Sequence, residues 1–184
     1  GTRLQGHPTT AEGLPGVRVA SGSLGQGLSV AVGVAQAKKL ANDNHLVYVL
    51  MGDGEQEEGQ IWEAAMYAPA KNVDNIVAIV DYNKKQIDGP TDDVLSLGDL
   101  RAKYESFGWK VWECNGNDMQ ELVDTFNKIR ENAHKGQSQI LLAHTEMGMG
   151  VDFMMGTHKW HGVAPNDEQA ANALSQLKET LGDY

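Results

Sequence analysis

Short apolar stretches rich in Val, Ile and Leu recur along the chain, and each of them ends in a polar residue or a glycine. Stretches of this composition are typical of β-strands. We predict strands at residues 45–52, 75–83, 109–116 and 139–146. Because their apolar positions are nearly continuous rather than alternating, we expect both faces of the resulting sheet to be covered.

Helical patterns occupy the segments before, between and after the predicted strands. We predict helices at residues 24–40, 57–70, 96–107, 118–134 and 167–181. The chain before the first helix is rich in Gly, Pro and Thr, so we expect it to be extended and looped. Strands that alternate with helices indicate an α/β fold, with a mainly parallel sheet and helices on both faces. No repeat or linker interrupts the pattern, and we expect residues 1–184 to form a single domain.

The composition excludes several classes of protein. Of the 184 residues, 41% are hydrophobic and 22% are charged, which argues against a disordered chain. The net charge of −10 argues against binding to nucleic acid or an anionic membrane, because both need a basic surface. No apolar stretch reaches the length of a membrane span, and the single Cys114 favours a reducing, cytoplasmic location. The first residue is Gly1 rather than Met, which is consistent with a processed or truncated product.

Polar residues follow the first two predicted strands at the points where they end. Gly52-Asp53-Gly54 ends the first strand and Asn83 ends the second. Ligands bind beyond the carboxyl ends of parallel strands, so Asp53 and Asn83 share one crevice if these strands are neighbours. Glycines let a backbone approach a ligand closely, and N–H groups at a helix start favour phosphate oxygens. One carboxylate and one amide oxygen form a sparse ligand set, typical of Mg²⁺ or Ca²⁺ that ligand phosphates also hold.

The same residues also have ordinary structural explanations. Acidic residues are favoured in the first turn of any helix by its dipole, so we expect Glu55 and Glu57 to be solvated and peripheral. An aspartate between two glycines is often only a turn residue. Taken by itself, the Gly-Asp-Gly motif is therefore a weak indication of a metal site.

The spacing of the two strand ends makes the indication more specific. A Gly-Asp-Gly motif followed about thirty residues later by an asparagine that ends an apolar strand resembles the cofactor motif of thiamine diphosphate enzymes. Further stretches are similar to the cofactor-binding half of transketolases, in the same order and over nearly the whole chain. They read LPGVRVASGSLGQGLSVAVGVAQA, GDGEQEEGQIWEAA, NKKQIDGPT, FGW and THKWHG. Pyruvate dehydrogenase E1 and related enzymes share the metal motif but not the GSLGQG stretch.

The resemblance to transketolases implies a cofactor and a metal ion: thiamine diphosphate with Mg²⁺ (or Ca²⁺ or Mn²⁺). It implies that the Asp53 carboxylate, the Asn83 side chain and the main-chain oxygen of Lys85 bind the ion. It also implies that the Gly54 amide faces the diphosphate. The residues that it assigns to cofactor binding are Gly22, Leu24, Gly52, Gly54, Asn83 and His161.

Three residues match family positions that take part in catalysis. Glu58 matches a glutamate in a carboxylate relay between paired active sites, and we expect it to face a buried contact between subunits. His7, in QGHP, matches a histidine that contacts the reacting end of the sugar. His161, in KWHG, matches one that lies near the diphosphate and reaches the substrate. Imidazole suits both tasks because it exchanges a proton near neutral pH.

The implied activity is transfer of a two-carbon ketol unit between phosphorylated ketose and aldose sugars, with the cofactor stabilising the carbanion. The chain resembles a diphosphate-binding (PP-type) domain that lacks the family's usual first segment. It also lacks the pyrimidine-binding domain, which supplies the glutamate that activates the cofactor. We therefore expect little or no activity from this chain alone. Its partner would be a pyrimidine-binding domain or a separate C-terminal subunit, in a homodimer or heterotetramer.

Three alternatives remain open at this point. The chain resembles 1-deoxyxylulose-5-phosphate synthase and other thiamine diphosphate enzymes, although GSLGQG and IDGPT argue against that assignment. It also fits a non-catalytic module that binds only the cofactor or a partner. A metal-dependent phosphatase that uses Asp53 and the neighbouring acids is a third possibility. The last would release phosphate without thiamine diphosphate.

Overall fold

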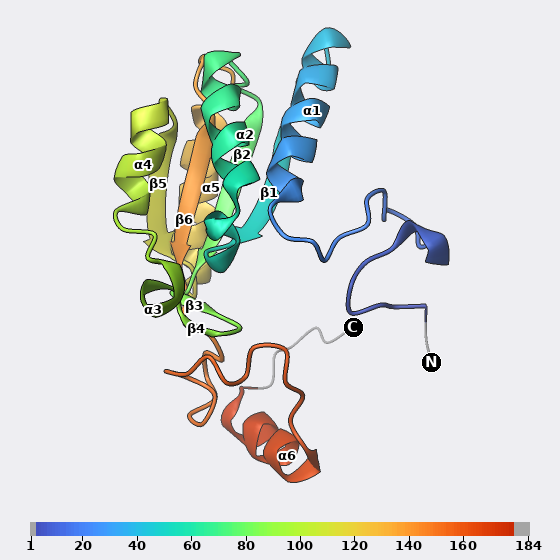
Figure 1. Ribbon diagram of the computed structural model, residues 1–184, viewed down its shortest axis with the longest axis vertical. Coiled ribbons are helices and arrows are strands. Elements are labelled where there is room, and N and C mark those ends of the chain that lie inside the picture. The colour runs from blue at the N-terminus through green and yellow to red at the C-terminus, as the bar shows by residue number, and fades with distance from the viewer. Residues whose placement is uncertain (1–2, 179–184) are drawn as a thin grey trace.

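The computed structural model describes residues 3–178, and a four-stranded sheet lies at its centre (Figure 1). The strand order is β1-β2-β6-β5, and every neighbouring pair is parallel. Each strand lies within two residues of its predicted bounds. The strands are β1 (Val47–Gly52), β2 (Ile76–Tyr82), β5 (Lys110–Asn115) and β6 (Gln139–His144).

Helices cover both faces of the sheet, as predicted. The larger buried cluster packs one face beneath α1 (Gln26–Leu40), α2 (Gly59–Ala70) and α4 (Leu100–Phe107). The smaller cluster packs the other face beneath α5 (Met119–Glu131), which lies behind the strands in Figure 1. The predicted α/β class, with a mainly parallel sheet, is therefore confirmed.

Coverage of the second face is incomplete at β1. Val49 and Met51 are buried beneath the helices, whereas Tyr48 and Leu50 point to the other side and are 48% and 71% exposed. The apolar pattern of β1 is continuous, and we expected the strand to be covered on both faces. That expectation is wrong for β1 within the part of the chain that the structure describes, because α5 packs mainly against β5.

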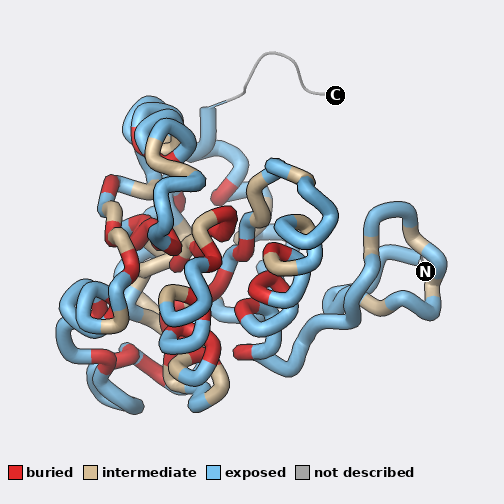
Figure 2. Tube along the Cα trace, turned by 90° about the horizontal axis from the view of Figure 1, so that it is seen from above, coloured by how far each residue is buried: buried red, intermediate tan, exposed pale blue. Residues whose placement is uncertain are grey.

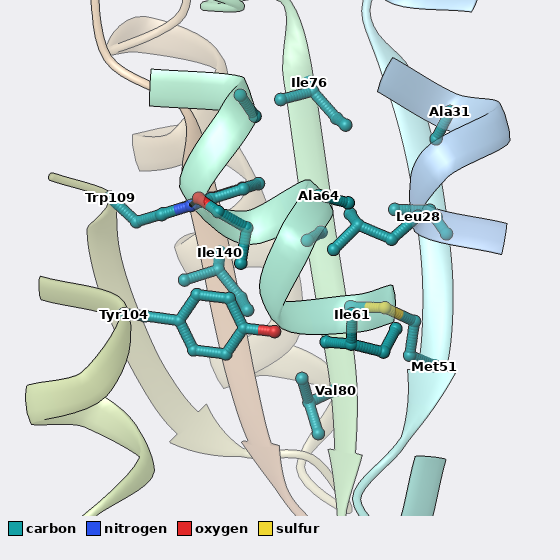
Figure 3. Close-up of a cluster of buried hydrophobic side chains, with 14 of the residues drawn as sticks. Leu28, Ala31, Met51, Ile61, Ala64, Ile76, Val80, Tyr104, Trp109 and Ile140 are labelled. Atoms are coloured by element: carbon teal, nitrogen blue, oxygen red, sulfur yellow. Dashed lines mark hydrogen bonds between the residues drawn. The ribbon is translucent and has the colours of Figure 1, made fainter. Parts of the chain in front are cut away.

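Aromatic residues and small residues share the larger cluster (Figure 3). The Trp109 indole N–H donates to the main-chain oxygen of Ala65 on α2 at 2.7 Å, and the ring meets Tyr104 edge to face. The Tyr104 hydroxyl donates to Oε1 of the fully buried Gln56 at 2.5 Å. These two bonds satisfy the polar ends of large side chains, which are costly to bury without a partner.

Several helix ends differ from their predicted positions. The helix predicted to start at residue 96 starts at Leu100, because the Asp99 side chain caps it by accepting from the Ala102 N–H at 2.8 Å. The helix predicted to end at residue 134 ends at Glu131, and His134 then adopts a left-handed conformation with φ of 58°. The final helix, α6 (Asp167–Gln176), is shorter than predicted, and residues 179–181 lie outside the described residues.

Several short elements were not predicted, because two- to five-residue segments have too few positions to show a period. They are the 3₁₀ turns η1 (Thr10–Glu12) and η2 (Gly54–Glu57), the hairpin of β3 (Lys85–Gln86) and β4 (Gly89–Pro90), and the helix α3 (Thr91–Leu95). Both η2 and the β3–β4 hairpin lie at the carboxyl edge of the sheet, directly after β1 and β2.

Residues 3–25 form an arm that extends away from the sheet and is exposed along almost its whole length (Figures 1 and 2). Apart from η1, the arm is irregular, as its composition predicted. Among the described helices, none combines the length and apolar character needed to cross a membrane.

Because the strands are buried to different extents, replacing a side chain by alanine should change the free energy of unfolding by different amounts on β6 and on β1. Ile140→Ala, on central β6 where Ile140 is fully buried, should lower the free energy of unfolding by about 2–5 kcal/mol through lost burial and a cavity. Leu50→Ala should change it by less than about 0.5 kcal/mol, because Leu50 is largely exposed. Urea unfolding of both variants checks this, and similar losses would contradict the exposure of β1.

The Tyr104 hydroxyl provides a second test of the core. Tyr104→Phe should lower the free energy of unfolding by about 1–3 kcal/mol, because it leaves the buried Gln56 Oε1 without a donor. Tyr67→Phe is the matched control, because the exposed Tyr67 hydroxyl accepts from Gln36 at 3.2 Å at the protein surface. Chemical denaturation should separate the two variants, and an unaffected Tyr104→Phe protein would show that the buried bond is not formed.

Candidate functional site

A cavity of about 510 Å³ lies at the carboxyl edge of the sheet, where β1 and β2 end side by side. The register pairs Gly52 with Asp81, so the residues that follow the two strands meet at this edge. This confirms that the strands bearing Asp53 and Asn83 are neighbours. Eight of the ten predicted site residues line the cavity: Leu24, Gly52, Asp53, Gly54, Glu58, Asn83, Lys85 and His161.

Asp53 is the most deeply placed acidic group of the cavity, with only 1% of its surface exposed. One carboxylate oxygen accepts from the Gly54 N–H at 2.7 Å, and the other accepts from the Lys84 N–H. Lys84 reaches this position through a left-handed turn with φ of 61°. The Gly54 amide, which the resemblance directed at a diphosphate, is therefore bonded to Asp53 here.

Burial raises the pKa of Asp53, and the nearby Asp81 carboxylate raises it further. The hydrogen bonds from the Lys84 and Gly54 amides oppose this shift but do not cancel it. The Lys85 ammonium, from another residue that lines the cavity, pairs with Glu146 at 3.1 Å. A bound cation at Asp53 would favour the charged carboxylate, so the electrostatics fit a positively charged ligand.

The remaining predicted metal ligands come from the turn after β2. The Asn83 side-chain oxygen accepts from the Lys85 N–H at 2.9 Å, which places Asn83 and the Lys85 backbone together. Within residues 3–178 no group of three or more His, Cys, Asp or Glu side chains is arranged to hold a metal ion. The predicted ligands are one carboxylate, one amide oxygen and one main-chain oxygen, a set that fits a hard divalent ion sharing its coordination with a ligand.

Two glycines beside the cavity have no room for a side chain. A Cβ on Gly54 would lie 2.7 Å from Cβ of Gln86, and one on Gly25 would lie 2.8 Å from Cβ of Glu58. Gly25 also has a left-handed φ of 85°. These close approaches hold the β3–β4 hairpin and the start of α1 against the turn after β1, so three separate segments form one cavity wall.

The acidic residues after Asp53 are not arranged as expected. Glu55 accepts from the Gly25 N–H at 2.8 Å and from the Gly52 N–H at 3.0 Å, and Glu57 accepts from the Gln86 side chain at 3.1 Å. Both line the cavity and are half-buried, so the prediction that they are solvated and peripheral is wrong. No local pattern could show this, because the partners of Glu55 and Glu57 lie up to 30 residues away.

Gln56 is a further residue of the site, and no pattern in the sequence indicates its role. Its side-chain N–H donates to the main-chain oxygen of Gly52 at 3.0 Å, while its oxygen accepts from Tyr104. Gln56 is completely buried, although glutamine usually lies at the surface. Gly52 thus has both of its backbone polar groups held by the two residues Glu55 and Gln56.

The three predicted catalytic residues differ in whether they line the cavity. His161, in the loop after β6, lines the cavity, and the Glu146–Lys85 ion pair connects the start of that loop to the turn after β2. Glu58 lines the cavity and is exposed in the chain. His7 and Gly22 lie on the arm, where the His7 ring approaches the Cβ position of Gly22 to 2.8 Å. Neither His7 nor Gly22 lines the cavity.

Comparison with known proteins agrees with this arrangement. Residues 1–182 match the family described as transketolase, thiamine diphosphate binding domain. One of the subunits of apulose-4-phosphate transketolase from Phocaeicola vulgatus is 44% identical over 98% of this chain and 63% of its own length. The 6-deoxy-6-sulfo-D-fructose transketolase subunit SqwG of a Clostridium species is 37% identical over 89% of this chain and 59% of its own length.

Solved structures agree with the sequence comparison. The crystal structure of transketolase from Campylobacter jejuni superimposes with a TM-score of 0.85 at 30% identity. It covers 95% of this chain, which in turn spans 28% of that enzyme. The chain thus spans about 63% of the length of its relative from Phocaeicola vulgatus and a smaller part of the Campylobacter enzyme. With its matched residues and its cavity at the strand ends, this chain belongs to the transketolase family, within the thiamine diphosphate binding domain.

Proposed function

We propose that the chain is the diphosphate- and metal-binding half of a transketolase, which moves a two-carbon ketol unit between phosphorylated sugars. The observation that supports this most is the meeting of Asp53 and Asn83 in one cavity beside closely packed glycine turns. The buried Asp53 carboxylate accepts its hydrogen bonds from backbone amides, which leaves its charge available to a divalent ion held together with a diphosphate.

In this proposal the Asp53 carboxylate, the Asn83 side-chain oxygen and the Lys85 main-chain oxygen hold Mg²⁺, Ca²⁺ or Mn²⁺. Gly52 and Gly54 let the backbone approach the diphosphate, while Leu24 offers an apolar surface, 55% exposed, to a cofactor ring. Thiamine diphosphate supplies carbanion stabilisation when bound. The chain's own residues bind and orient it.

The proposed catalytic residues act around this centre. His161 lines the cavity, where its imidazole can donate or accept a proton beside the diphosphate and the substrate. His7 has the same chemistry but lies on the arm, beside Gly22 and outside the lining of the cavity. Glu58 is exposed in this chain, and in this proposal it contacts a carboxylate of a second subunit.

The partner that completes the site is a pyrimidine-binding transketolase domain or a separate C-terminal subunit. The naming of several relatives as individual subunits of transketolases supports a separately encoded partner. We propose a homodimer or heterotetramer that acts on sugar phosphates in the cytoplasm, with little or no activity in this chain alone.

Asp53→Ala tests the metal site. The variant should lose Mg²⁺-dependent binding of thiamine diphosphate, because it removes the buried carboxylate that lies against the turn after β2, while its circular dichroism spectrum stays that of the wild type. Isothermal titration with Mg²⁺ and with EDTA provides the measurement, on the chain alone and on the assembly isolated from its source.

Asp124→Ala is the matched control, because Asp124 is an exposed aspartate of α5 that accepts from Gln120 at 3.0 Å, away from the cavity. It should bind the cofactor as the wild type does. If Asp53→Ala binds the cofactor with unchanged affinity and unchanged dependence on Mg²⁺, the metal role of Asp53 is wrong.

The partner is tested by native mass spectrometry of the protein isolated from its source organism. We expect the mass spectrum to show this 20.0 kDa sequence either in a complex with a distinct second polypeptide or as part of a longer chain. Only the complex or the longer chain should transfer ketol units. The assay pairs a ketose phosphate donor with an aldose phosphate acceptor. Turnover by the separate chain at the rate of the assembly would contradict the proposal.

A further inference from the structure

The carboxylate of Glu55 joins two segments that are distant in the sequence. Its Oε1 accepts from the Gly25 N–H at 2.8 Å, and its Oε2 accepts from the Gly52 N–H at 3.0 Å. Gly25 immediately precedes α1, whereas Gly52 is the last residue of β1. A single side chain therefore bonds the start of a helix to the end of a strand.

Each of these amides borders a wall of the cavity. Gly25 follows Leu24, which lines one side, and Gly52 precedes Asp53, which lies at the base. Gly25 is the N-cap of α1 and, as a glycine, has no side chain that could cap the helix. The Glu55 carboxylate places an acceptor at this helix start, and its negative charge is favourable at the N-terminus of a helix.

The bonds of Glu55 are reinforced by their surroundings. Gly25 packs closely on Glu58, because a Cβ at this position would lie 2.8 Å from Cβ of Glu58. On the other side, the Gln56 side chain donates to the Gly52 carbonyl at 3.0 Å, so a turn of the Gly52–Asp53 peptide would break this hydrogen bond. Hydrogen bonds to a charged acceptor are roughly twice as strong as neutral ones, which favours Glu55 as the central connection.

We propose that Glu55 is a positioning residue whose carboxylate fixes the distance between the Leu24 wall and the Asp53 base of the cavity. It acts through the backbone of Gly25 and Gly52 rather than by touching the cofactor. The inference rests on the proposed function only in naming the ligand, thiamine diphosphate, whose ring and metal ends would contact the two walls.

Glu55→Gln tests the proposal with little change of shape. A glutamine side chain has one acceptor oxygen, so it can bond one of the two amides while its NH₂ group faces the other N–H. In the cofactor-free chain, amide hydrogen exchange at Gly25 or Gly52 should accelerate by about ten-fold or more, as loss of a charge-assisted bond predicts. Glu55→Ala should accelerate exchange at both amides. NMR resolves these residues individually.

Glu121→Gln is the matched control. Glu121 also accepts a backbone N–H at the end of a strand, from Asn115 at 2.9 Å in β5, but it does not line the cavity. This variant should accelerate exchange near Asn115 only. In all variants, exchange in central β2 and β6 should match the wild type, which shows that the fold is intact.

A second measurement connects the two bonds to binding. Titration with Mg²⁺ and thiamine diphosphate should show that the affinity for the cofactor is reduced by about ten-fold or more in Glu55→Gln and is unchanged in Glu121→Gln.

The proposal is overturned if the Gly25 and Gly52 amides of the Glu55→Ala variant both exchange at the wild-type rate. Faster exchange with unchanged affinity would also overturn it, because the two walls would then be independent of binding. If the wild-type chain and its assembly bind no cofactor, the proposed function fails, and the exchange rates alone decide the role of Glu55.

Discussion

The parallel pairing of β1 with β2 determines where the polar groups of the site lie. Its register places Gly52 opposite Asp81, so the turns after both strands emerge at one edge. A shift of the register would separate Asp53 from Asn83 along the edge and open the cavity between them. Both strands are fixed by their buried side chains beneath α1 and α2, and the geometry of the site is therefore set by apolar packing some distance away from it.

The core also reaches the site through hydrogen bonds. Tyr104 on α4 donates to Gln56, and Gln56 donates to the Gly52 carbonyl, so two hydrogen bonds connect an outer helix to the residue before Asp53. Each donor in this series is satisfied by the next acceptor, so the series is rigid as long as all of its bonds are present. In this way the same side chains stabilise the fold and orient the turn that carries Asp53.

The resemblance to transketolases, rather than a local pattern, named cavity residues such as Leu24, Glu58 and His161. The sequence pattern itself predicted the strands and their parallel arrangement, because buried strands have a simple local pattern. It placed helix ends less well, since the Asp99 cap and the left-handed His134 depend on single residues. Glu55 was misjudged for a different reason. Its position after Asp53 is typical of a solvated helix start, and only the folded chain brings Gly25 to it. For His7 the resemblance named a role, but His7 is not among the residues that line the cavity.

The exposed side of β1 affects how readily the isolated chain aggregates. Among the described strands β1 is the outermost of the sheet next to β2, so one side of its backbone has no strand partner there. Tyr48 and Leu50 add an exposed apolar surface to this outermost strand. An open, apolar edge is the kind of template on which other chains add strands and aggregate. In isolation, the colloidal stability of this protein therefore depends on how well its acidic charge keeps such edges apart.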